Sequence, residues 1–274
     1  MTKVIFIGKT KTTFAPGGSM LTRLSTHPFP KNHTAALVGV WTELQTLLQG
    51  VQRWGRFKGL GMEVREQDLV QHTLAITFLG ATLIGRVRAH LPTIFDDRLV
   101  LTTLIVHDVG EALLKRDVSV TRKETSHDVA EYVAFCEFIN KMPADMQLYY
   151  KTAFLLQFVL DENKWPLFDD DAQGILAELA ATRHYEAVMF TITEHYDYIM
   201  FMIEHHENGN SYLLYEAMKT EIPIWPKLKK LLPAFGEIIF PPEVEAWLME
   251  FRRLYEEAGG ETRSTYDIVA AAKA

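Results

Sequence analysis

The stretch Leu104-Ile105-Val106-His107-Asp108-Val109-Gly110-Glu111 places two ionisable residues inside an apolar segment with helical spacing. The segment opens on acidic residues at Asp96 and its apolar stripe continues to about Lys115, which predicts one helix over this range. A charge buried in such a stripe without a partner would cost several kcal/mol, so His107 and Asp108 need one. A metal ion would satisfy both, because neutral imidazole and ionised carboxylate are good metal ligands.

Two further residues lie on the faces that such a site would use. Glu111 follows His107 by four residues, which is the same face of a continuous helix. His72 shares the apolar stripe of the preceding helix, three residues after Leu69 and four before Ile76. If the two helices pack antiparallel, His72 lies opposite His107. The alternative is a core histidine bonded to a backbone carbonyl.

Apolar residues at helical spacing run through most of the chain, whereas alternating strand patterns are nearly absent. The first 35 residues are rich in Thr, Pro, Gly and Ser and are expected to form one short strand with loops. A second His-Asp pair, His127-Asp128, follows a polar segment and is expected to be a solvated helix start. The fold class is therefore predicted to be all-α. Helices are expected at about 34–53, 66–90, 96–115, 124–141, 144–160, 171–207 in one or two pieces, 211–218, 242–258 and 265–273.

Composition excludes several classes of protein. The 274 residues are 48% hydrophobic, which is enough for a sizeable core, and intrinsic disorder is excluded as a general description. The net charge of −7 is opposite in sign to that of a general nucleic-acid binder. The single cysteine, Cys136, excludes a disulfide framework and a cysteine-based zinc cluster. No apolar run is long enough for a signal peptide or a membrane span, so a cytoplasmic protein without a membrane partner is expected.

An ordered series of motifs resembles the HD-domain phosphohydrolases, and within them the YfbR-like 5′-deoxynucleotidases. The resemblance covers roughly residues 45–215. It implies an HD-domain helical bundle over 36–220, with a short N-terminal extension over 1–35 and a C-terminal helical extension over 221–274 packed on the same domain. The motifs are, in order, Gln52-Arg53-Trp54, Val70-Gln71-His72, the stretch from His107 to Leu114, Asp117 to Lys123, and Ile203 to Leu214.

The resemblance also implies a role for each residue that matches a family motif. A pair of acidic residues would act in catalysis, namely Glu111 at the attacking water and Asp117 near the phosphoryl group. Substrate would be bound by Arg53 and Lys123 at the phosphate and by Trp54 at the sugar. The implied metal ligands are His72, His107, Asp108 and Glu194.

Glu194 is where the chain departs from the family pattern. The family has an aspartate about fifteen residues before its closing glycine, and counting back from Gly209 reaches Glu194. A glutamate can coordinate a metal with one more methylene of reach. Asp197, or the acidic run Asp169 to Asp171, could supply this ligand instead.

The implied function is a metal-dependent hydrolase that releases phosphate from (deoxy)ribonucleoside 5′-monophosphates by attack of metal-activated water on phosphorus. A donor set without thiolate suits one divalent ion, Mn, Co, Fe, Zn or Mg, without choosing among them. The alternatives are a dNTP triphosphohydrolase, a cyclic nucleotide phosphodiesterase and a non-catalytic nucleotide sensor. The expected partner is a small-molecule nucleotide, and the Trp, Phe and Met content of the later helices would permit a homodimer.

Overall fold

The computed structural model describes residues 4–7, 10–13, 31–53, 67–115, 123–207 and 224–232, together with 246, 249, 250, 252, 253 and 256. The chain divides into two compact units, Met1–Trp41 and Thr42–Ala274. None of the helices in these described ranges is long and apolar enough to cross a lipid bilayer.

The smaller unit contains a β-hairpin. Strand β1 (Val4–Ile7) pairs antiparallel with β2 (Thr10–Thr13), so that Val4 lies opposite Thr13. The sequence predicted one strand here, and the prediction missed the second because the polar run 10–13 has no apolar alternation. Helix α2 (Lys31–Gln49) begins in this unit and ends in the larger one.

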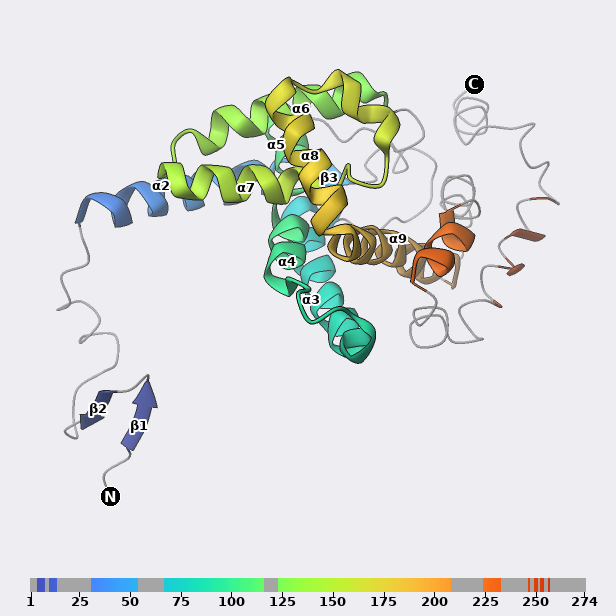
Figure 1. Ribbon diagram of the computed structural model, residues 1–274, viewed down its shortest axis with the longest axis horizontal. Helices are drawn as coiled ribbons and strands as arrows, with labels where there is room; N and C mark the ends of the chain where they lie inside the picture. Colours follow the sequence, from blue (N-terminus) through green and yellow to red (C-terminus); the bar gives the residue numbers. More distant parts are fainter. Residues whose placement is uncertain are drawn as a thin grey trace. The chain divides into compact units, whose positions relative to one another are not determined.

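The larger unit is all-α, as predicted, and its centre is formed by three helices that contact one another (Figure 1). These are α3 (Leu69–Val87), α4 (Asp97–Val106) and α9 (His184–Glu207). Gly80 of α3 makes the packing close, because a Cβ at this position would clash with Leu104 of α4. Ile76 and Leu104 are completely buried in this contact region.

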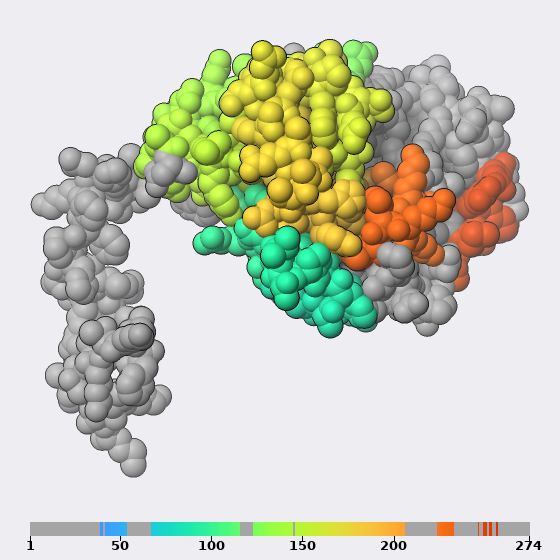
Figure 2. All heavy atoms as spheres, in the orientation of Figure 1, coloured from blue at the N-terminus to red at the C-terminus, as the bar shows by residue number. Residues whose placement is uncertain are grey.

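The remaining helices form a chain of contacts that returns to α9. The members are α5 (Val109–Leu114), α6 (Thr125–Ile139), α7 (Ala144–Leu156), the 3-10 helix η3 (Glu162–Leu167) and α8 (Asp170–Thr182). Aromatic packing joins α6 to α7, where the rings of Phe135 and Phe154 stack with centroids 4.4 Å apart. Figure 2 shows α7 and α8 side by side on the surface, in green and yellow.

Most predicted helices are confirmed to within a few residues, with two corrections. The helix predicted over 96–115 is wrong as one element, because the structure ends α4 at Val106 and starts α5 at Val109. A helix over 224–231 was not predicted, because Pro226 suggested a break. This proline lies in the first turn, where a helix tolerates it.

The range predicted as 171–207 is two helices, separated at Arg183. The predicted helix over 242–258 is helical at each described position. The predicted helices 211–218 and 265–273 lie outside the described residues.

Candidate metal centre

His72 lies in the first turn of α3, where a capping box fixes the start of the helix. The Asp68 side chain accepts a hydrogen bond from the backbone N–H of Gln71 at 2.8 Å, and the Gln71 side chain accepts one from the backbone of Asp68 at 3.2 Å. Four residues into this helix, His72 is completely buried together with Leu69 and Ile76. The shared burial of the three residues is what their apolar spacing predicts.

His107 and Asp108 form the junction between α4 and α5. The backbone N–H of His107 still donates to Thr103 O at 2.9 Å, whereas Asp108 has φ −91° and ψ 1°, which interrupts the helix. Both side chains are nearly buried, with residue exposures of 5% and 9%. Asp108 therefore lies between the two helices, where it precedes the first residue of α5.

The two imidazoles and the Asp108 carboxylate converge on one point. His72 Nε2 lies 3.4 Å from His107 Nε2. The Asp108 carboxylate spans both rings, with Oδ2 3.5 Å from His72 Nε2 and Oδ1 3.3 Å from His107 Nε2. One ligand atom from each of the three residues lies within 4.8 Å of the others, so this cluster could hold a metal ion.

The opposite nitrogen of each imidazole determines the tautomer. His107 Nδ1 lies 3.0 Å from the Leu104 carbonyl, and His72 Nδ1 lies 3.1 Å from Asp197 Oδ2. The Leu104 carbonyl only accepts hydrogen bonds, so it favours a proton on His107 Nδ1, and the negative charge of Asp197 favours one on His72 Nδ1. Both Nε2 atoms face the cluster. Lone pairs facing one another at these distances repel unless a cation lies between them. The donor set therefore fits a divalent metal.

The same charges act on the pKa values of the cluster. Burial alone would lower the pKa of His107, but the charges of Asp108 and Glu194 outweigh it and raise the pKa to about 9. Burial would raise the pKa of Asp108, yet His107, His72 and Arg53 hold it below its ordinary value. In the absence of a metal, a proton on His107 is the cation that the carboxylates stabilise.

The residue proposed as fourth ligand lies at the edge of this cluster. Glu194 Oε2 is 3.2 Å from His107 Nε2, and the nearby imidazoles and Arg53 hold its pKa well below the ordinary value despite burial. Asp197 contacts the far nitrogen of His72, which makes it a partner that orients this ring. Two residues of the alternative acidic run are occupied elsewhere: Asp169 caps α8 by accepting from Ala172 N, and Asp171 pairs with Lys151.

Arg53 is brought to the same place by a short strand pairing. Strand β3 (Gln52–Arg53) pairs with β4 (Gln67–Asp68), directly before α3. The guanidinium of Arg53 is buried and donates a hydrogen bond to the Tyr198 hydroxyl at 3.2 Å. Burial opposes its charge, but Tyr198 and the cluster carboxylates, first among them Asp108, raise the pKa further above its ordinary value.

Glu111 and Lys123 are also brought together. Lys123 Nζ donates to Glu111 Oε1 at 3.0 Å. Glu111 lies in α5, the helix after the break at Asp108, rather than in the single continuous helix that was predicted. Burial and the Asp108 charge, opposed by Lys123, raise the pKa of Glu111 to about 8.

The interpretation of His127-Asp128 as a solvated helix start is wrong for the aspartate. Asp128 is 1% exposed and its carboxylate lies 2.7 Å from Lys164 Nζ and 3.5 Å from Lys123 Nζ. Two lysines far apart in the sequence neutralise it, which local polarity could not indicate. Among the other predicted site residues, Trp54 and Asp117 lie outside the described residues.

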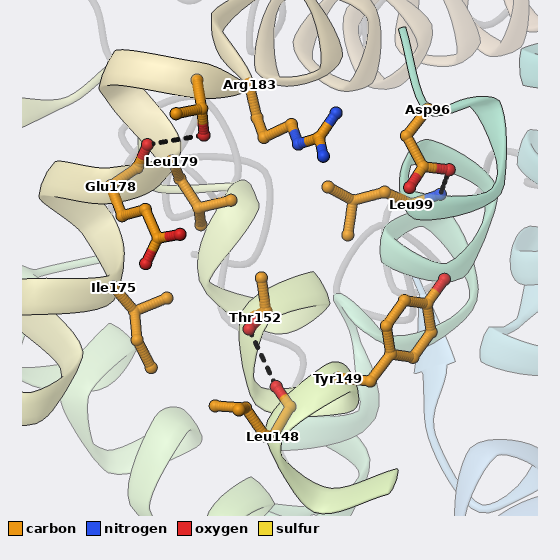
Figure 3. A pocket seen from close by; sticks show the side chains of 10 residues that line it. Asp96, Leu99, Leu148, Tyr149, Thr152, Ile175, Glu178, Leu179 and Arg183 are labelled. Atoms are coloured by element: carbon orange, nitrogen blue, oxygen red, sulfur yellow. Dashed lines mark hydrogen bonds between the residues drawn. The ribbon is translucent and has the colours of Figure 1, made fainter. Parts of the chain in front are cut away.

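A separate cavity of about 520 Å³ lies at the other end of α4. Figure 3 shows Arg183 and Asp96 on one side of it and Leu148 on the opposite side. Helix α4 runs from this cavity to the His107 junction, and its ten residues at roughly 1.5 Å each span about 15 Å. None of the residues that line the cavity belongs to the cluster of imidazoles and carboxylates.

Fold and site together define an all-α protein with a buried cluster of imidazoles and carboxylates suited to a divalent metal. No protein-family model matches the chain, and no curated protein matches its sequence. Among solved structures, the chain is similar to the crystal structure of a predicted metal-dependent phosphohydrolase from Magnetospirillum magnetotacticum MS-1. The identity is 15% and the TM-score is 0.46, over 84% of this chain and 95% of that chain. The all-α class and the site therefore rest on the residues of this chain itself.

Proposed function

We propose that this protein is a metal-dependent phosphohydrolase of the HD type that releases orthophosphate from (deoxy)ribonucleoside 5′-monophosphates. The observation that carries the proposal is the convergence of His72, His107 and Asp108, with each imidazole Nδ1 already engaged on the other side. Bound there, a divalent ion would supply Lewis acidity, which polarises a phosphoryl oxygen and lowers the pKa of water. Glu194 is the fourth proposed ligand, because it contacts His107 from α9.

Arg53 supports a phosphorylated substrate. Its buried guanidinium lies close enough to Asp108 and Glu194 for their charges to raise its pKa, so a cation borders the proposed metal ligands. A planar guanidinium is well suited to phosphate oxygens and remains charged at any physiological pH. Arg53 would bind the phosphoryl oxygens and stabilise their charge during attack.

Glu111 supports the transfer of a proton near the reacting water. A pKa of about 8, raised first by burial and then by Asp108, keeps most of this carboxyl protonated at pH 7 and lets it ionise just above that pH. Acid–base groups work best when their pKa is close to the working pH, and such groups typically contribute about 10²–10⁴-fold to the rate. Glu111 is accordingly proposed to accept or donate the proton of the attacking water.

The test is release of orthophosphate from a panel of nucleotides. Purified protein with Mn²⁺, Co²⁺ or Mg²⁺ is incubated with 5′-dNMPs, 5′-NMPs, 3′-NMPs, dNTPs and 3′,5′-cyclic nucleotides. Asp108→Asn removes the carboxylate that spans both imidazoles, and Asp171→Asn is the matched control because its carboxylate is exposed and pairs with Lys151. Circular dichroism confirms that each variant is folded.

Release from 5′-monophosphates that is lost in Asp108→Asn and kept in Asp171→Asn would support the proposal. Tripolyphosphate from dNTPs, or ring opening of a cyclic nucleotide, would replace it with another hydrolase of the same site. Bound metal near one ion per chain with no turnover of any substrate would instead support a nucleotide sensor.

A further inference from the structure

The resemblance to the phosphohydrolases assigns Lys123 to the substrate phosphate, but its surroundings are acidic. Lys123 Nζ lies 3.0 Å from Glu111 Oε1, 2.8 Å from Glu131 Oε2 and 3.5 Å from Asp128 Oδ1. The ammonium group donates a hydrogen bond to Glu111 and forms ion pairs with the other two carboxylates. A phosphate would have to displace one of them to reach Nζ.

Electrostatics oppose that displacement. The three carboxylates are nearly buried, with residue exposures of 8% for Glu111, 2% for Glu131 and 1% for Asp128. A phosphate dianion placed at Nζ would lie beside these acidic groups in a region from which water is largely excluded, where repulsion by each ionised carboxylate is weakly screened. Arg53, in contrast, borders the proposed metal ligands.

The far side of the cluster is fixed by the packing of α5 on α6. A Cβ at Gly110 would lie 2.5 Å from Glu131 Cβ and 2.9 Å from Glu131 Cα, so only glycine permits this approach. The contact places the Glu131 side chain next to residue 111. Asp128, one turn earlier in α6, is held in addition by Lys164 of η3 at 2.7 Å.

We infer that Lys123 is a positioning residue rather than a phosphate ligand: Glu131 and Asp128 hold its ammonium, and the ammonium holds the Glu111 carboxylate beside the proposed metal site. The inference deepens the proposed function, since it concerns the group that handles the proton in that reaction. Its sequence of contacts runs from Lys164 through Asp128 and Lys123 to Glu111.

The experiment compares phosphate binding with turnover. Orthophosphate is titrated into the Mn²⁺-loaded protein and its dissociation constant is taken from the rise in melting temperature; kcat and KM are measured on a 5′-dNMP. The variants are Lys123→Met, Glu131→Gln and, as the reference for lost phosphate binding, Arg53→Met. Lys141→Met is the matched lysine control, because it pairs with Glu43 on the surface.

Positioning predicts that Lys123→Met and Glu131→Gln bind orthophosphate within about twofold of the wild type while kcat falls at least tenfold. Arg53→Met should lose the phosphate response and Lys141→Met should change nothing. Lys123→Met leaves three acidic groups without their lysine and could fail to fold for that reason. Glu131→Gln keeps the lysine, so its phosphate binding and kcat can be compared with those of the wild type in the same way. A loss of phosphate binding in Lys123→Met equal to that in Arg53→Met would overturn the inference, as would an unchanged kcat in Glu131→Gln. A wild type that binds orthophosphate but hydrolyses no monophosphate would fault the proposed function while leaving the binding comparison intact.

Discussion

His72 Nδ1 lies 3.1 Å from Asp197 Oδ2, on the side of the imidazole that faces away from Asp108. The negative charge of the carboxylate favours a proton on Nδ1, which would leave the Nε2 lone pair for a metal. Asp197 is three residues after Glu194 on α9, so one helix face supplies a proposed ligand to His107 and an orienting partner to His72.

Asp197→Asn should weaken metal binding without abolishing it. The amide can still face His72 but no longer favours the required tautomer through a negative charge, and loss of such a partner typically costs about 10–100-fold in affinity. Calorimetric titration of the metal-free protein with Co²⁺ or Mn²⁺ measures the change. Asp171→Asn is the control and should bind as the wild type does. Loss of binding in the control alone would instead favour the acidic run before α8 as the ligand.

The cluster of imidazoles and carboxylates was largely predictable from the sequence, because its two histidines are polar residues at positions where the helical spacing expects apolar ones. The break at His107 was not, since residues 104–114 keep helical spacing throughout. Gly110, two residues after the junction, packs closely against Glu131, a residue of another helix. The spacing of apolar residues within one segment cannot indicate a contact with a residue of another helix.

Asp197 was predicted only as an alternative metal ligand and not as a partner of His72, and Tyr198 was missed as a site residue. They follow Glu194 by three and four residues, so they share its face of α9, and this spacing was the signal that could have identified them. Lys123 is the opposite case. The family pattern implied that it binds the substrate phosphate, whereas the carboxylates around it favour a role in positioning Glu111. From the sequence alone, its partners Glu131 and Asp128 would be placed on an ordinary polar face of α6.

Metal binding should strengthen as pH rises toward 9. Below that value His107 is protonated in the metal-free protein, since Asp108 and Glu194 raise its pKa to about 9 against the effect of burial. The metal must displace this proton, so the apparent affinity should rise by up to about tenfold per pH unit and then level off. Titrations with Co²⁺ between pH 6.5 and 9.5 measure the slope. A flat profile would contradict a protonated His107.

The stability of the metal-free protein should change in the opposite direction. The folded-state pKa of His107 is about 9, above the ordinary 6.5. Protonation of His107 therefore stabilises the fold, and this stabilisation is fully present below pH 6.5 and is lost as the pH rises through 9. Glu111, with a pKa raised to about 8, acts with the same sign. Thermal unfolding in the presence of a chelator should therefore show a falling melting temperature from pH 6.5 to 9. Saturating metal should remove most of the His107 contribution.

Gly110→Ala should destabilise the fold. The new Cβ would lie 2.5 Å from Glu131 Cβ and 2.9 Å from the Glu131 backbone, and such overpacking typically costs about 1–3 kcal/mol. Gly85→Ala in α3 is the matched control, because nothing lies within 4 Å of its Cβ and alanine is the better helix former. Urea unfolding should show a loss of stability for the first variant and a small gain for the second. Equal effects would mean that α5 is not packed on α6 as described.

Tyr198→Phe should reduce phosphate binding while leaving the metal in place. The hydroxyl accepts a hydrogen bond from Arg53 at 3.2 Å, and the guanidinium carbon lies 5.4 Å from the centre of the tyrosine ring. The substitution keeps the ring contact and removes the hydroxyl, which typically contributes about 0.5–1.5 kcal/mol as a hydrogen bond. KM for a 5′-monophosphate should therefore rise roughly two- to tenfold, with Co²⁺ affinity unchanged. Tyr149→Phe, at a hydroxyl that contacts Thr102 beside the separate cavity, is the control and should leave KM unchanged. A fall in Co²⁺ affinity for Tyr198→Phe would show that Tyr198 supports the metal ligands rather than Arg53.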